Sequence, residues 1–250
     1  GVIGQSLSIV VTGMDFISGA SSVDFGAGIT VGAVTIDTTG THLTAGITIA
    51  SGAAAGLRSV TVTNGGPGGG SSMLGSAFTI ANLAPTLTAL STYAAGRGQT
   101  LNVTMTGTNF ATGVTTVSFG VNITVNSLTV SSSTSAIANI TVAASAIIGA
   151  RSVSVTNAPP GGGTATLVSV FNVGNPTPTL STIAPASGAR GQTLDVAITG
   201  TGFVSGTSTL TLGADITANS FTVTSFTQIN ANITIASAGA AGGRDVTVSN

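Results

Sequence analysis

The chain has 250 residues, of which only 4% are charged, and its formal net charge is −1. Five arginines and no lysine cannot form the basic patch that binding to nucleic acid or to an anionic membrane requires. The absence of cysteine excludes disulfides and thiolate metal sites, and no apolar run reaches the ~18 to 20 residues of a spanning helix.

Two motifs recur along the chain and define an internal repeat. The first, GQSLSIVVTGMDF, ends at Phe16 and returns in similar form at Phe110 and Phe203, at spacings of 94 and 93 residues. The second, LRSVTVTN, ends at Asn64 and returns 93 and then again 93 residues later. We therefore expect three domains, covering residues 1–83, 84–176 and 177–250.

The spacing of the two motifs differs by one residue between the first repeat and the second. We interpret this difference as a single deletion in a loop of repeat 1, between Ile36 and Ile47.

Within each repeat, apolar residues alternate with polar ones, which is typical of strands buried on one face. In the second repeat Leu101, Val103 and Met105 alternate with Asn and Thr, and several later segments have the same pattern. Glycine-rich turns separate these segments, and no segment has a helical period. The pattern predicts about seven strands per repeat in an antiparallel two-sheet sandwich of immunoglobulin size.

The chain starts and stops out of phase with this repeat. Repeat 1 lacks a counterpart of PTLTALSTYAAG, which opens repeat 2, and repeat 3 stops before a counterpart of TLVSVFNV. We expect the first and last sandwiches each to lack about one strand. Two interpretations stay open: a longer array has been cut here, or a strand from the next subunit fills each incomplete sandwich.

The order PTLSTIAPASGARGQTLDVAITGTGF, a strand ending in FG or LG, and a Gly/Ala-rich turn into RSVSVTN resembles the IPT/TIG immunoglobulin-like repeat. The resemblance covers essentially all of repeat 2 and the matching parts of the others. It implies an early-set immunoglobulin sandwich, often found in tandem arrays on bacterial surface proteins, adhesins and receptor ectodomains. Repeat 1 departs from the pattern, with Val2 and Ile3 where the others have Ala-Arg or Gly-Arg.

Residues suited to catalysis or metal binding are scarce. None of the six aspartates recurs at the same position in another repeat, whereas a repeated metal or carboxylate site would keep its ligands in register. The single histidine, His42, falls in an expected loop, and we interpret it as a solvated residue rather than a catalytic base. We therefore predict no catalytic, cofactor-binding or metal-binding residues, no cofactor and no enzyme activity.

Arg58, Arg151 and Arg244 are the one charged position kept in all three repeats. They either bond loop carbonyls of their own repeat or form a repeating interface with the next domain or a neighbouring chain. Four Asn-x-Ser/Thr sequons are expected to face outward and are candidates for glycosylation. The asparagines concerned are Asn102, Asn122, Asn139 and Asn232.

These observations favour a structural module of an extracellular fibre, stalk or sheath. Low charge leaves little repulsion between copies, so we expect self-association into a homopolymer or contact with other surface proteins. The alternative is a cell-surface adhesin or ligand-binding module. Carbohydrate sites usually present aromatic platforms, and the chain has no tryptophan and a single tyrosine, so glycan binding is the weaker form of this alternative.

Overall fold

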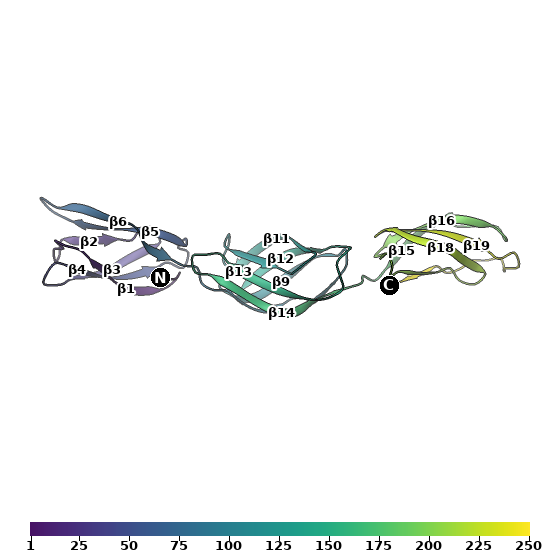
Figure 1. Cartoon of the computed structure of the whole chain (residues 1–250), viewed down its shortest axis with the longest axis horizontal. Helices are drawn as coiled ribbons and strands as arrows, with labels where there is room; N and C mark the ends of the chain where they lie inside the picture. The colour runs from purple at the N-terminus through teal and green to yellow at the C-terminus, as the bar shows by residue number, and fades with distance from the viewer.

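The computed structural model describes all residues from 1 to 250. Every regular element is a β-strand, and the strands form three two-sheet sandwiches arranged in a row (Figure 1). The prediction of an all-β chain of three tandem immunoglobulin-like sandwiches is thus confirmed. No helix in the structure has the length and apolar character needed to cross a membrane.

The middle repeat has the fullest set of strands. One sheet has the order β11-β12-β9-β7 and the other the order β10-β13-β14-β8. The expected seven strands become eight because the first one is divided: β7 pairs with β9 in one sheet, while β8 crosses over and pairs in parallel with β14 in the other. Its strands are β7 (Thr86–Leu90), β8 (Ala94–Gly96), β9 (Thr100–Thr108), β10 (Thr115–Ser118), β11 (Ile123–Ser132), β12 (Ser135–Val142), β13 (Gly149–Asn157) and β14 (Gly163–Gly174).

The core of the middle repeat contains 17 buried residues, the largest such cluster in the chain. At its centre the rings of Phe119 and Phe171 meet edge to face, with 5.3 Å between centroids and 79° between planes. Edge-to-face aromatic pairs contribute about 0.5 to 1.5 kcal/mol beyond the area that they bury. Because Phe171 belongs to β14, the last strand completes the core of this repeat.

Repeat 1 has three-stranded sheets of order β1-β4-β3 and β2-β5-β6, and no strand of the chain lies where β7 lies in repeat 2. Phe78 of β6 packs against Phe25 with a centroid distance of 5.4 Å, as Phe171 packs against Phe119. Its core divides into clusters of six and three buried residues. Its strands are β1 (Ser6–Thr12), β2 (Ser21–Asp24), β3 (Ile29–Ile36), β4 (His42–Ile49), β5 (Gly56–Asn64) and β6 (Gly70–Ile80).

Repeat 3 has a four-stranded sheet of order β15-β16-β19-β18 facing a sheet of only two strands, β17 and β20. No strand of the chain lies where β14 lies in repeat 2, and the core falls to eight buried residues. Leu180 is 41% exposed, although its counterpart Leu87 is 7% exposed. The strands are β15 (Thr179–Ala184), β16 (Thr193–Thr201), β17 (Thr209–Thr211), β18 (Ile216–Ser225), β19 (Gln228–Ile235) and β20 (Thr247–Ser249).

The expected deletion in repeat 1 is wrong in sign. The hairpin between β3 and β4 leaves six residues between the paired Ile36 and Leu43, whereas five residues separate the paired Val130 and Ala136 of repeat 2. Repeat 1 therefore has one extra residue in this loop. The carboxylate of Asp37 accepts hydrogen bonds from the hydroxyl of Thr39 and the amides of Thr41 and His42 across the loop.

Two glycines in the first recurrent motif are needed where strands approach closely. A Cβ on Gly107 would lie 2.0 Å from the carbonyl oxygen of Thr86, and one on Gly200 would lie 1.9 Å from that of Thr179. In repeat 1 the counterpart, Gly13, would meet only the ring of Phe16, because no strand lies beside β1 at that edge.

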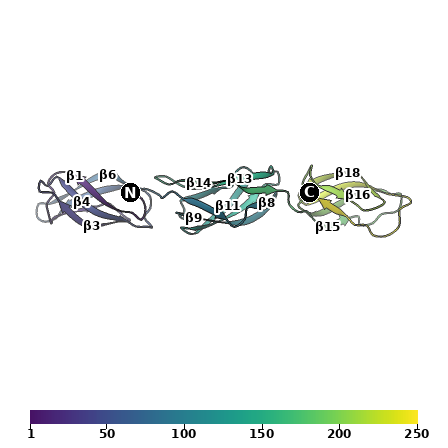
Figure 2. The ribbon, with the colours of Figure 1, turned by 90° about the horizontal axis from the view of Figure 1, so that it is seen from below.

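Hydrogen bonds tie the first joint between repeats. The amide of Asn82 donates to the carbonyl of Pro160, the amide of Gly162 donates to the carbonyl of Asn82, and the side chain of Asn82 donates to the carbonyl of Ala158 at 2.7 Å. Both views place the N-terminus beside this joint and the C-terminus beside the second one (Figures 1 and 2).

We expect Phe119→Ala to lower the free energy of unfolding of repeat 2 by about 3 to 5 kcal/mol, because it removes a fully buried ring and leaves a cavity. Tyr93, the only tyrosine in a chain without tryptophan, lies in this repeat, so its fluorescence in a urea titration follows repeat 2 alone. The control is Val121→Ala, at a side chain 74% exposed, which should change stability by less than about 0.5 kcal/mol. Equal effects of the two substitutions would contradict the assigned core.

Candidate functional site

The most prominent candidate sites are two open grooves, one in each outer sandwich. In repeat 1 a groove of about 540 Å³ runs along the free edge of β1, where β7 would lie in the middle repeat. Twelve of its fifteen lining residues are hydrophobic, and among them Met14 is 79% exposed and Met73 and Leu74 are each 68% exposed. These side chains lack the cover that β7 gives to the equivalent face of repeat 2.

The groove of repeat 3 has a volume of about 300 Å³ and lies over Leu212, Val246 and Ile233. Leu212 is the counterpart of Phe119, so the opening lies where the ring of Phe171 sits in repeat 2. The segment that leads into β20, from Gly239 to Val246, contributes to the lining of this groove, and β20 itself pairs only with β17. Each outer sandwich thus combines an unpaired strand edge with a groove that contains apolar side chains, a combination that favours pairing with another strand.

The three recurrent arginines bond carbonyls of their own repeat. In each case an Nη2 donates to the carbonyl oxygen of the residue four positions earlier: Ala54 for Arg58 at 2.5 Å, Ile147 for Arg151, and Ala240 for Arg244 at 2.7 Å. Arg244 also forms an ion pair of 3.2 Å with Asp215. The guanidinium therefore fastens the loop before β5, β13 or the chain leading to β20, and the proposed interface role of these arginines stays a prediction.

A second recurrent network, built on an asparagine, is one that the sequence analysis did not assign. The side chain of Asn157 accepts a hydrogen bond from Thr115 at 2.6 Å and donates to the carbonyls of Leu83 at 2.9 Å and Asn109 at 2.7 Å. Asn250 repeats this arrangement with Ser208, Pro176 and Gly202. In repeat 1, Asn64 bonds Ser21 and the carbonyl of Asp15.

This asparagine network fixes the linker that enters a repeat, because Leu83 and Pro176 precede the first strand of repeats 2 and 3. The identity of Asn at three positions spaced by 93 residues was the sequence signal for it. The sequence alone does not indicate the bond to the linker, because the two residues that it joins are 74 positions apart.

Several aspartates have the same backbone conformation or accept the same hydrogen bond as an uncharged residue at the equivalent position of another repeat. Asp15 and Asn109 both have φ of 61° and Asp215 and Asn122 have φ of 65° and 62°, a left-handed conformation that Asp and Asn tolerate better than most residues. Asp195 accepts a bond from Asn232, as Asn102 accepts one from Asn139. Asp245 is exposed. No group of three or more His, Asp or Glu side chains is placed to hold a metal ion.

The predicted sequons lie on the outer side of the strands or at a turn. Asn102 and Asn122 are exposed, while Asn139 and Asn232 are half-buried. In repeat 2 the asparagine side chains form a chain of hydrogen bonds across the sheet, from Asn126 to Asn139 and from Asn139 to Asn102. Glycosylation at these four sites stays a prediction.

The expected loop position of His42 is wrong, because this residue begins β4 and pairs with Thr12, where it borders a hydrogen-bonded loop around Asp37. Its Nδ1 lies 3.0 Å from Asp37 Oδ2 and 3.0 Å from Thr41 Oγ1, so both neighbours contact the same ring nitrogen. A hydrolytic triad needs the nucleophile on one nitrogen and the acid on the other, so this geometry is not that of a triad. The hydroxyl of Thr39 and the amides of Thr41 and His42 hold the pKa of Asp37 well below its usual value, with the Thr39 bond contributing most.

No family model matches this chain, and no curated protein matches it. Among solved structures it is similar to the Escherichia coli adhesin FdeC, with 17% identity, 99% of this chain and 88% of that chain covered, and a TM-score of 0.31. A three-domain structure of titin, I67–I69, has 10% identity, coverage of 99% and 92%, and a TM-score of 0.34. The ectodomain fragment D1–D4 of ICAM-5 has 14% identity, coverage of 99% and 71%, and a TM-score of 0.37.

Replacing Arg58, Arg151 and Arg244 together by Gln should lower the melting temperature, because each loses several charge-assisted bonds to loop carbonyls, worth about 1 to 2 kcal/mol per arginine. Arg190→Gln, at an exposed arginine, serves as the control and should change little. Calorimetry gives the melting temperatures and light scattering gives the particle size. Loss of assembly with unchanged melting would instead assign these arginines to an interface.

The stability of repeat 1 should decrease as the pH falls below about 4. The folded pKa of Asp37 is lowered, so its contribution is complete above the unfolded pKa of about 3.9 and is lost as the pH falls toward the folded value. Asp37→Asn should remove this part of the pH dependence, which thermal melts between pH 2 and pH 6 would measure. An unchanged slope in the variant would show that Asp37 is not the responsible group.

Proposed function

We propose that the chain is a structural repeat module of an extracellular fibre, stalk or sheath that assembles through its low-charge surfaces. The support is an architecture of three sandwiches in line, joined by hydrogen-bonded linkers rather than by long flexible ones. Linkers containing proline, such as the one at Pro176 and Pro178, favour semi-rigid joints that transmit tension.

The observation that carries the proposal is the pair of open grooves at β1 and β20. The groove of repeat 1 lies along the free edge of β1, and the groove of repeat 3 lies beside the segment that leads into β20. The net charge of the chain is −1, which gives little repulsion between copies. We propose that a strand of a neighbouring subunit, with the alternating pattern of β14, fills the groove of repeat 3 by strand addition.

Three finer assignments belong to the same proposal. We place the repeats in the IPT/TIG type on the order and spacing of their motifs, and we place the protein at the cell surface or outside the cell. We also propose that this segment has no enzyme activity, which is supported by the contact of Asp37 and Thr41 with the same ring nitrogen of His42 and by the structural roles of the aspartates. Its partners would be further copies of itself or other surface proteins.

A cell-surface adhesin is the second candidate function. The observation that favours it is a polar cleft at the joint between repeats 2 and 3, which contains an arginine without a partner.

We expect concentrated, purified chain to form fibres or rods visible by electron microscopy. A synthetic peptide with the sequence of residues 163–174 should enter the groove of repeat 3, raise the melting temperature of that repeat and shorten the fibres. The matched control is the same peptide with Phe171→Ser, which lacks the ring that would cover Leu212 and should have little effect.

Strictly monomeric behaviour at high concentration would contradict the fibre proposal. Fibres whose length is unchanged by the peptide would contradict strand addition at repeat 3 while leaving assembly itself in place.

A further inference from the structure

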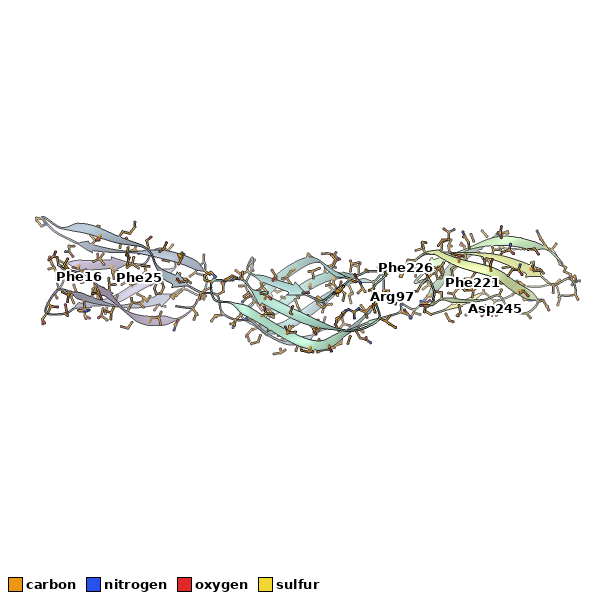
Figure 3. All side chains as sticks on the ribbon, in the orientation of Figure 1. Phe16, Phe25, Arg97, Phe221, Phe226 and Asp245 are labelled. Carbon is orange, nitrogen blue, oxygen red and sulfur yellow. The ribbon has the colours of Figure 1, made fainter.

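The second joint holds a cleft with a composition unlike that of either groove. Its volume is about 450 Å³, and it is formed by the turn between β8 and β9, the linker between the repeats, and the hairpin that joins β18 to β19. Ten residues line it, and all but Phe226 and Pro176 are polar or glycine. Figure 3 shows Arg97 and Phe226 close together in the space between the second and third sandwiches.

Arg97 is the charged group of this cleft, and it lacks a partner. Its Nε is buried and makes no hydrogen bond, and the two ion pairs of the chain, His42–Asp37 and Arg244–Asp215, do not involve it. An unpaired buried donor is unfavourable, because it has lost its hydrogen bonds to water and gained none from the protein. The contrast with Arg151, which bonds three carbonyls of its own repeat, indicates that Arg97 is not retained to fasten a loop.

Phe226 supplies an apolar surface beside this arginine. It lies at the tip of the hairpin, where repeat 2 has Ser133, and its ring packs on Gly98 of the neighbouring repeat. A Cβ on Gly98 would lie 2.7 Å from the ring, and Gly98 has φ of +73°, so only glycine fits there without strain. The ring is half-buried and therefore keeps part of its surface accessible.

The first joint lacks both features. Ile3 stands at the position of Arg97, and Ser133 stands at the position of Phe226. In repeat 3 the counterpart of Arg97 is Arg190, which is exposed and has no hairpin from a following repeat beside it. The combination of arginine, aromatic ring and neutral polar groups is thus specific to the second joint.

We propose that this cleft binds a carboxylated sugar unit, such as a uronate at the end or within a glycan. The guanidinium of Arg97 pairs with the carboxylate, for which its planar fork of donors is suited. The ring of Phe226 packs against the C–H face of the sugar. The Gln99 side-chain NH2, which has no partner, and the side chains of Asn175 and Thr177 bond the sugar hydroxyls. This inference deepens the second candidate function and does not depend on fibre assembly.

The experiment compares two probes that differ only in the carboxylate: methyl glucuronide and methyl glucoside. Isothermal titration and saturation-transfer NMR with the full chain should detect the glucuronide and not the glucoside. Arg97→Gln and Phe226→Ser should each weaken binding at least tenfold, and Phe226→Ser restores the residue type of repeat 2, so folding is expected to persist. Arg190→Gln is the matched control and should bind as the unmodified chain does.

Tyr93 fluorescence melts check that repeat 2 is folded in Arg97→Gln, and calorimetry checks that repeat 3 is folded in Phe226→Ser and Arg190→Gln. Absence of saturable glucuronide binding, equal binding of the glucoside, or equal binding of acetate or an N-acetyl aspartate amide would overturn the proposal. An equal loss with Arg190→Gln would also overturn it. Light scattering of the same samples reports assembly, so failure of the sugar site and failure of the fibre function are distinguishable.

Discussion

The structure depends above all on the last strand of each repeat, whose apolar side chains fill the core between the two sheets. In the middle repeat β14 brings Phe171 onto Phe119, pairs with both β13 and β8, and covers the leucines of β7. Repeat 1 has no counterpart of β7 and repeat 3 has no counterpart of β14. Both repeats keep the sandwich fold, but their buried cores are smaller than that of repeat 2. The same constraint produces the exposed edges and apolar grooves that would allow the outer repeats to associate.

The joints depend on a different set of interactions, which are polar and local. Asn157 at the end of β13 and its counterpart Asn250 each donate one bond to a linker carbonyl, of Leu83 or Pro176, and one to the loop after β9 or β16. Such bonds fix the direction in which a repeat leaves its neighbour without requiring a large apolar interface. Residues of the joint that do not form these bonds can differ from one joint to the other. The second joint therefore contains Arg97 and Phe226, where the first contains Ile3 and Ser133.

Much of the architecture could be predicted from the sequence, because alternation with period two and a repeat of about 93 residues report directly on strands and domains. The division of the first strand into β7 and β8 was not predicted, since short segments such as Ala94–Gly96 have no alternating pattern. The extra residue beside Asp37 could also be predicted, because Phe16 and Asn64 are 48 positions apart whereas Phe110 and Asn157 are 47 apart. The expected deletion has the wrong sign because this difference makes repeat 1 the longer one. The site at the second joint was missed because Arg97 and Phe226 lie 129 residues apart and meet only where two repeats are placed end to end.

The central proposal is that copies of the chain assemble and that the free edges of β1 and β20 become paired in the assembly. Hydrogen–deuterium exchange of these strands, in dilute and in concentrated samples, tests it most directly. The account predicts fast exchange of the outward-facing edge amides of β1 and β20 in the dilute chain and strong protection of the same amides in the concentrated one. Equally fast exchange of both edges in an assembled sample would contradict it.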